Sequence, residues 1–291
     1  MNARTKLNLG LLALLLCLAL FVWFTPPHQD AEDTTELLNL KSDDITRIEI
    51  ERTGNDMIRL HRDQDRWWLR LPFTPDAVAA SEFRIQSLLA LTTVQSRNRF
   101  ALQTPDLAKY GLEKPRVIVR INGIELHFGD AEALHQRRYV RFGDWIHLVD
   151  GQYYTPLLID GAQYADTALL PGHPALASIK IPGLTLHRQD NGSWTGLPTD
   201  QTLGADTLNA YIDFWRYAQA VELEFRLDSP KRDDWVIVTR DGESIRFTVI
   251  NEASRTIVVN HTSRLGYRLE QGTLDKLRQP ARHHTRPVAQ P

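Results

Sequence analysis

Cysteine is almost absent from this chain of 291 residues, which contains only Cys17. A single cysteine excludes a disulfide within the chain and any site that needs several thiolates, such as a structural zinc site or a C-x-x-C redox pair. Cys17 lies in an apolar run directly after Leu16, where a lipoprotein site has a small residue. We therefore interpret it as a small apolar side chain within a membrane helix.

An excess of either charge is also absent. The 34 Lys and Arg residues nearly balance the 36 Asp and Glu residues, and the formal net charge is −2. Nucleic-acid-binding domains carry a clear basic patch or stripe, so the composition predicts no nucleic-acid partner. With 42% hydrophobic residues, the chain can build one or two globular domains with real cores.

Familiar catalytic and cofactor motifs are lacking. The chain has no G-x-S-x-G, H-E-x-x-H, C-x-x-C or phosphate-binding loop. The pair His283-His284 lacks a nearby carboxylate, and the pairs Asp43-Asp44 and Asp233-Asp234 are typical of strand starts and turns. We predict a protein that is not an enzyme and has no catalytic residue, cofactor or metal site.

A long apolar run near the N-terminus is the first positive feature. Residues 9–24 are apolar apart from one glycine, and Arg4 and Lys6 precede them. The bulky residues Phe21 to Phe24 leave no small-x-small cleavage site. The pattern predicts a signal anchor over residues 1–25 that spans the bacterial inner membrane once, with the C-terminal part in the periplasm. A cleaved signal peptide remains the alternative.

The second positive feature is an internal repeat. Leu60-His61-Arg62 is followed by Trp68, and Leu186-His187-Arg188 is followed by Trp194, with an Arg-to-Trp spacing of six residues in both places. We expect the two Trp residues to occupy equivalent strand positions in the core or at its rim. Adjacent strand residues point to opposite faces, so neither His-Arg pair can jointly bind one ligand.

Each repeat combines strands with one helix. In the first, alternation and turn residues predict strands within 45–50, 57–60 and 67–71, a helix over 83–91, and hairpins over 117–128 and 139–149. In the second, the expected elements are strands within 179–186 and from 194, a helix whose buried face is Leu208, Tyr211, Ile212 and Trp215, a hairpin over 236–250, and strands at 257–259 and 267–269.

These elements predict an α+β fold of two repeated modules, each a mostly antiparallel sheet with one packed helix, behind the membrane helix. The predicted divisions are a linker over residues 26–43, module one over 44–170, module two over 171–277 and a disordered tail over 278–291. The acidic linker begins with Pro26-Pro27, and ordered structure is expected from about Asp44. The stretch Pro171 to Pro174 is interpreted as a hinge between the modules.

Module one also carries a family signature. Strand pairs that end in a Trp precede a helix, then Tyr110-Gly111-Leu112 stands three residues before Pro115, and Gly129 follows a hairpin. This arrangement resembles the bacterial family of domains of unknown function numbered forty-three forty, over roughly residues 40 to 170 with a weaker echo to 277. The resemblance implies exported proteins with one N-terminal membrane helix. Some relatives lie beside ABC transporters and resemble the gliding-motility auxiliary component of such transporters.

The loop Lys109, Tyr110, Gly111 and Leu112 is a possible partner contact, because connecting loops often carry function. Alternatively, it covers the edge of the sheet. The leading hypothesis is a non-enzymatic accessory or scaffold subunit of an envelope complex, with an ABC transporter as the partner that the resemblance implies. The second hypothesis is a module that binds an envelope glycan, lipid or peptide in a cleft between the modules.

Overall fold

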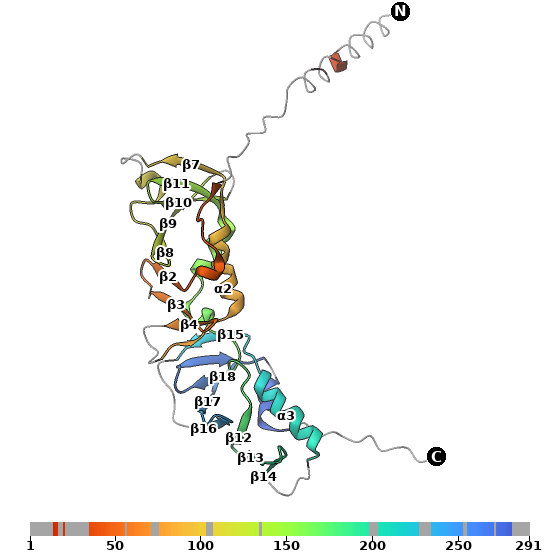
Figure 1. The fold of residues 1–291 in the computed structure, drawn as a ribbon. Coiled ribbons are helices and arrows are strands. Elements are labelled where there is room, and N and C mark those ends of the chain that lie inside the picture. The colour runs from red at the N-terminus through yellow and green to blue at the C-terminus, as the bar shows by residue number, and fades with distance from the viewer. Residues whose placement is uncertain are drawn as a thin grey trace, which may run out of the picture.

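The computed structural model describes residues 14–16, 20, 35–55, 57–70, 76–102, 107–133, 136–197, 203–226, 234–252, 255–270 and 272–280. Two antiparallel sheets follow one another along the long axis of the molecule, and each has a helix on the same flank (Figure 1). Most of the predicted anchor and of the C-terminal tail lies outside the described residues. Among the residues that are described, no helix is both long enough and apolar enough to cross a membrane.

The first sheet belongs to module one and has nine strands in the order β5-β4-β3-β2-β8-β9-β10-β11-β7. Its predicted hairpin at Asn122-Gly123 is confirmed, and both turn residues have the positive φ that such a turn requires, at 49° and 86°. The strands are β2 (Arg47–Arg52), β3 (Ile58–Asp63), β4 (Arg66–Arg70), β5 (Val78–Ala79), β7 (Asn98–Ala101), β8 (Val117–Ile121), β9 (Ile124–Ala131), β10 (Arg137–Phe142) and β11 (Trp145–Asp150).

The second sheet belongs to module two and has eight strands in the order β14-β13-β12-β16-β17-β18-β19-β15. The tight turn at Pro182-Gly183 joins β12 to β13. The strands are β12 (Leu176–Ile181), β13 (Leu184–Arg188), β14 (Trp194–Leu197), β15 (Glu222–Phe225), β16 (Asp234–Thr239), β17 (Ser244–Glu252), β18 (Arg255–Asn260) and β19 (Leu265–Arg268).

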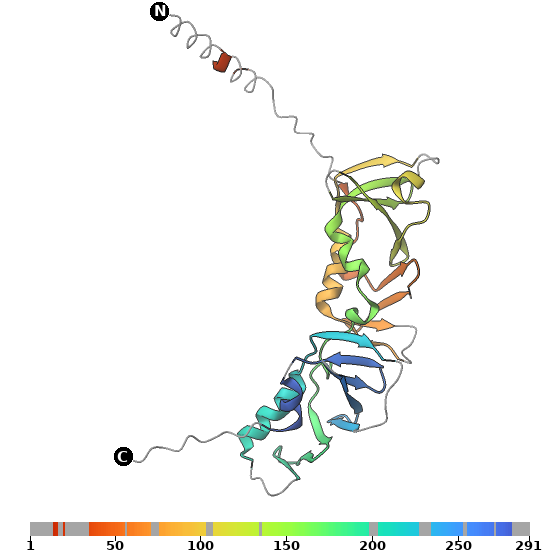
Figure 2. The same cartoon turned by 180° about the vertical axis from the view of Figure 1, so that it is seen from behind.

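The predicted repeat is confirmed by this topology. When the first sheet is followed from β4 to β7 and the second from β14 to β15, the chain visits the strand positions in the same order. The helices α2 (Glu82–Leu89) and α3 (Ala205–Tyr217) are inserted at the same point of each copy. Seen from behind, both helices again share one flank (Figure 2). The short strand β5 is additional in module one.

The expected equivalence of Trp68 and Trp194 is wrong by one residue. In module one Arg62 pairs with Trp67, whereas in module two Arg188 pairs with Trp194. Trp194 therefore corresponds to Trp67 in register. The cause is the length of the connection. The stretch from Arg188 to its partner Trp194 is one residue longer than the stretch from Arg62 to its partner Trp67. A one-residue change reverses the face of every following side chain.

Both predicted helices bury an apolar face, and that of α3 is the face that the sequence predicts. α2 buries Ile85, Leu88 and Leu89, and the buried residues of α3 are Leu208, Tyr211, Ile212 and Trp215. In module two the indole of Trp215 packs edge-on against Trp235, with ring centroids 5.5 Å apart. The short C-terminal helix α4 (Thr273–Arg278) is held to α3, because Tyr211 and Trp215 both donate hydrogen bonds to the Leu277 carbonyl.

The ordered body begins earlier than Asp44, which corrects the expected linker boundary at residue 43. Strand β1 (Thr35–Glu36) pairs with β6 (Gln95–Ser96), and Leu37 and Leu38 are buried. The apolar pair anchors this segment because its side chains leave water. The chain therefore joins module one beside β6, which contacts β11 near the end of the sheet that is opposite β5.

Candidate functional site

The segment between the two sheets is bonded to both of them. Ala80 of module one forms an antiparallel bridge with Ala165, and Ala168 forms another with Gln219 of module two. Four backbone hydrogen bonds accompany these bridges: Ser81 N to Tyr164 O at 2.8 Å, Asp166 N to Ala79 O at 2.9 Å, Leu169 N to Ala218 O at 3.0 Å, and Ala220 N to Thr167 O at 2.8 Å. Residues 164–169 thus connect the two modules in the manner of a shared strand.

The predicted hinge at Pro171 to Pro174 is held in place by α3. The Arg216 guanidinium donates to the carbonyls of His173 and Pro174, at 3.0 and 3.1 Å. The Nδ1 atom of His173 lies 2.8 Å from the Arg216 carbonyl, and its ring packs on Tyr217 with centroids 4.7 Å apart. We therefore interpret this turn as a fixed joint, because bending it breaks several contacts at once.

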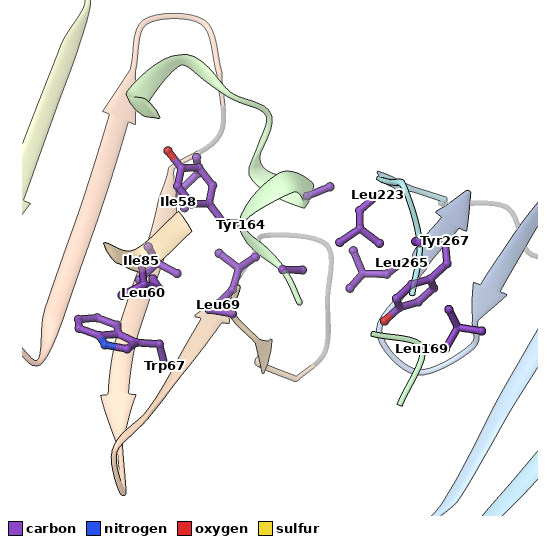
Figure 3. Packing of buried hydrophobic residues seen from close by; sticks show 14 of the residues in the cluster. Ile58, Leu60, Trp67, Leu69, Ile85, Tyr164, Leu169, Leu223, Leu265 and Tyr267 are labelled. Atoms are coloured by element: carbon purple, nitrogen blue, oxygen red, sulfur yellow. The ribbon is translucent and has the colours of Figure 1, made fainter. Parts of the chain in front are cut away.

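Apolar packing continues across the junction without a break (Figure 3). Tyr164 and Leu169 from the connecting segment are fully buried. In module two, the exposed fraction of each of the side chains Leu223, Leu265 and Tyr267 is at most 2%. The Tyr164 hydroxyl donates to the Pro156 carbonyl, so this buried polar group has a partner. Burial raises the pKa of Tyr164 well above that of a solvated tyrosine. The junction therefore has the character of a core and not of a loose domain contact.

A cleft of about 370 Å³ opens beside this junction. Module one contributes residues of β4, of β5 and of the segment that precedes β5, and module two contributes the start of β17 and the β18–β19 turn. Its apolar lining consists of Ala77, Val78, Ala79, Trp68, Leu169, Pro171, Pro174, Ile245 and Leu265. Such a volume lies in the range of roughly 300–1,000 Å³ that is typical of small-molecule sites, which often form between domains.

The charged residues that line the cleft are mostly acidic. Asp76, Asp241 and Glu243 are exposed, and Asp166 is half-buried and accepts a hydrogen bond from the Ala168 amide at 2.9 Å. The hydroxyl of Thr239 donates to Asp241 and holds the pKa of that carboxyl below its usual value. Four carboxyl groups therefore line the cleft, and three of them are exposed.

Arg66 is the one cation among the described residues that line the cleft. Its guanidinium carbon lies 6.0 Å from the centre of the Trp68 ring. Gly172 also lies close to this guanidinium. Its φ is 77°, and an added Cβ atom would lie 3.0 Å from the Arg66 Nη2 atom. The joint therefore favours glycine at this position, because L side chains rarely adopt such a positive φ.

The predicted contact loop of Lys109, Tyr110, Gly111 and Leu112 lies elsewhere, at the far end of module one. The short helix η4 (Ala108–Tyr110) places the Tyr110 ring between Phe100 and Tyr139, at centroid distances of 5.2 and 4.7 Å. Leu112 is only 2% exposed. The loop packs over β7 and β10, so it covers an apolar part of the sheet.

Two glycines allow this loop to lie so close to the sheet. An added Cβ atom at Gly129 of β9 would lie 2.2 Å from the Tyr110 carbonyl, and one at Gly111 would lie 2.5 Å from the Asp130 carboxyl carbon. The spacing that carries the family resemblance thus has a packing reason. Replacement of both Tyr110 and Leu112 by polar residues should harm the fold, because Leu112 is buried. Lys109 is exposed.

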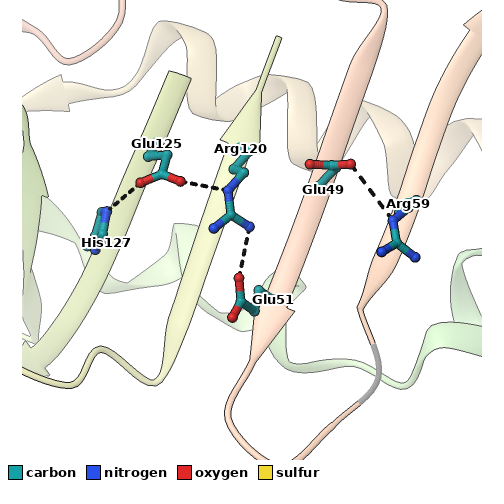
Figure 4. Close-up of polar contacts among 6 residues, drawn as sticks. All are labelled: Glu49, Glu51, Arg59, Arg120, Glu125 and His127. Carbon is teal, nitrogen blue, oxygen red and sulfur yellow. Dashed lines mark hydrogen bonds and ion pairs between the residues drawn. The ribbon is translucent and has the colours of Figure 1, made fainter. Parts of the chain in front are cut away.

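The outer face of the first sheet carries a ladder of charges (Figure 4). Arg120 pairs with Glu51 at 2.8 Å and with Glu125 at 2.7 Å, and His127 lies 3.1 Å from Glu125. The hydrogen bond from Arg120 is the main cause of the lowered pKa of Glu125. These groups are solvent-accessible, and exposed ion pairs contribute little stability, so we interpret the ladder as a solvated sheet face.

The His-Arg pairs that recur in the sequence do not form a site. His61 and Arg62 lie on opposite faces of β3, and Arg62 donates to the Asp43 carbonyl at 3.1 Å and to the Asp65 carboxylate at 2.9 Å. Their counterparts His187 and Arg188 are exposed. Within the described residues, no group of three or more His, Cys, Asp or Glu side chains is arranged to hold a metal. The pair His283-His284 lies outside those residues.

No curated protein and no solved structure matches the chain. A family model matches residues 74–224, a stretch that starts before β5, crosses the junction and ends within β15. The match covers more than half of the chain, and it continues beyond residue 170 into module two, where the sequence resemblance predicts only a weaker echo. The chain therefore belongs to the family described as Domain of unknown function (DUF4340).

Proposed function

We propose that this protein is a rigid arm anchored in the bacterial inner membrane, which acts in the periplasm as a non-enzymatic accessory or scaffold subunit of an envelope complex. The apolar run within residues 1–25 and its basic flank support the anchor. The observation that carries the proposal is the fixed junction, in which residues 164–169 are bridged to both modules and a continuous core surrounds them.

The place where the chain enters module one determines which end of the arm lies near the membrane. The segment that follows the anchor joins module one at β1, near β11, whereas module two is attached beyond β5 at the opposite end of the sheet. Neighbouring strands lie about 4.8 Å apart, so a nine-stranded sheet extends roughly 40 Å between these ends. A fixed junction then holds module two at that distance from the membrane-proximal end, which suits a spacer that presents a surface to a partner.

The partner is proposed to be a membrane complex, and an ABC transporter is the one that the family resemblance implies. Exposed Lys109 and the outer face of the first sheet are the surfaces of module one that such a partner can reach. Charged rims steer association and set specificity more than they add affinity. The interaction should therefore weaken as the salt concentration rises.

The experiment is co-purification of the full-length chain, tagged at its C-terminus, from detergent-solubilised membranes at low and high salt. We expect a stoichiometric membrane partner and a tag that is reached only from the periplasmic side. The matched control carries a cleaved secretion signal in place of residues 1–25, so the same body is exported without an anchor. Recovery of no partner in defined stoichiometry, or a tag on the cytoplasmic side, would contradict the proposal.

A second candidate function is favoured by the cleft at the junction. The binding of an envelope glycan, lipid or peptide needs a concave site with apolar and polar groups, and the cleft has Trp68 together with several carboxylates. Ligand-dependent protection of the full-length protein against thermal unfolding distinguishes this function from pure scaffolding, because a ligand that binds the folded state raises Tm by mass action.

A further inference from the structure

The cleft at the junction joins an apolar lining to an acidic opening. Its charged lining consists of four carboxylates, of Asp76, Asp166, Asp241 and Glu243, and a single guanidinium, that of Arg66. A concave site with low-dielectric walls concentrates the field of its charges and attracts ions of the opposite sign. We propose that this cleft binds an alkyl cation, that is, an ammonium or guanidinium group on a hydrocarbon stem.

The apolar lining accounts for the hydrocarbon part of such a ligand. Trp68 and Val78 of module one and Ile245 of module two are partly exposed and present apolar surface within the cleft. Long cationic side chains and amines bury their methylene groups on such surfaces while the charged head stays near water and carboxylates. Neither a bare metal ion nor a neutral apolar molecule uses both halves of this lining.

Arg66 is itself an alkyl cation that lies against one wall of the cleft. Its guanidinium lies 6.0 Å from the centre of the Trp68 ring, within the distance at which an indole face attracts a cation. The same group approaches Gly172, so its position is set by two walls. Arg66 therefore occupies space and carries a charge that an incoming cation must compete with. Removal of Arg66 should strengthen binding, while removal of the carboxylates should weaken it.

Two sources supply an alkyl cation in the envelope: a lysine or arginine side chain of a basic peptide segment, and a free polyamine. The experiment is calorimetric titration of the full-length protein in detergent at about 0.15 M salt. The probes are spermidine and a short peptide of alternating lysine and leucine, and a peptide with glutamine in place of lysine is the neutral control. Binding at the cleft does not depend on the membrane partner proposed above, so either idea can fail alone.

Three variants make the test specific to the cleft. D76N combined with E243Q removes two exposed carboxylates, and R66Q removes the competing cation. E113Q removes one exposed carboxylate of module one outside the cleft and is the matched control. Thermal unfolding of each variant establishes that the fold is retained.

We expect one of the two probes to bind the wild type. Its affinity should fall about tenfold in D76N/E243Q, rise severalfold in R66Q and stay unchanged in E113Q. Preference for the peptide identifies a protein segment as the ligand, and preference for spermidine identifies a free polyamine. The proposal is overturned if neither probe binds at about 1 mM. It is overturned equally if the neutral peptide binds as well as the lysine peptide, or if D76N/E243Q and E113Q behave alike.

Discussion

The substitution Trp215→Ala tests how strongly α3 is bound to the second sheet. The indole of Trp215 is fully buried, packs edge-on against Trp235 at 5.5 Å, and donates a hydrogen bond to the Leu277 carbonyl at 3.1 Å. Truncation of a buried aromatic side chain costs about 3–5 kcal/mol. The edge-on pair contributes about 0.5–1.5 kcal/mol of this, and the hydrogen bond a similar amount.

A second hydrogen bond to the Leu277 carbonyl limits the loss of stability in Trp215→Ala. The Leu277 carbonyl also accepts a bond from the Tyr211 hydroxyl at 2.6 Å, so Trp215→Ala does not leave it without a donor. We therefore expect a loss of about 3–4 kcal/mol, at the lower end of the range for such truncations. Trp215→Phe keeps an aromatic ring against Trp235 but removes the hydrogen bond, and should cost about 1–2 kcal/mol.

The measurement is urea-induced unfolding of the full-length protein in detergent, followed by circular dichroism. Phe83→Ala is the matched control, because it also truncates a helical aromatic residue, but one that is 73% exposed. The control should cost less than about 1 kcal/mol. An unchanged midpoint for Trp215→Ala, or equal losses for both variants, would refute the assignment of Trp215 as the anchor of α3.

Three further outcomes are expected. Gly129→Ala should destabilise module one by about 2 kcal/mol or more, because the new methyl group meets the Tyr110 carbonyl at 2.2 Å; a fall in Tm checks it, and an unchanged Tm contradicts the packing reason for the signature. Burial lowers the pKa of His147 to about 4, below the value near 6.5 that it has in the unfolded chain. As the pH falls, the unfolded state therefore binds a proton on this residue before the folded state does, and the free energy of unfolding decreases between about pH 6.5 and pH 4. His147→Leu should flatten this part of the pH profile, and a profile that is identical to the wild type would disprove that role. Lys109→Glu should reduce partner recovery without a change in Tm, whereas Lys114→Glu, a nearby exposed control, should not; equal recovery from both removes the loop from the interface.

The elements that the sequence predicts well are those whose signals are local. The turn at Asn122-Gly123 selects a hairpin because both positions need positive φ, and the helical spacing of Leu208, Tyr211 and Trp215 selects the buried face of α3. The repeat is visible for the same reason, since each copy carries its own local signals. The resemblance built on Tyr110 to Leu112 also led to the correct family.

The sequence misses elements whose existence depends on distant partners. β1, β7 and β15 have two or four residues each, too few for a clear period, and they become strands only because β6, β11 and β19 pair with them. Trp194 corresponds to Trp67 because the turn of module two is one residue longer than that of module one. The equal Arg-to-Trp spacing in the sequence does not reveal this difference in strand register.

The sequence by itself thus determined the α+β class, the duplication, the helix faces and the hairpins, because each follows from side-chain periodicity and turn chemistry within a few residues. Only the tertiary structure decided that the supposed hinge is a fixed joint, that Leu112 is buried, and that Arg66 and Glu243 line one cleft. Those features depend on contacts between segments that are far apart in the chain. Such contacts are fixed by how two sheets pack together, and no local pattern records them.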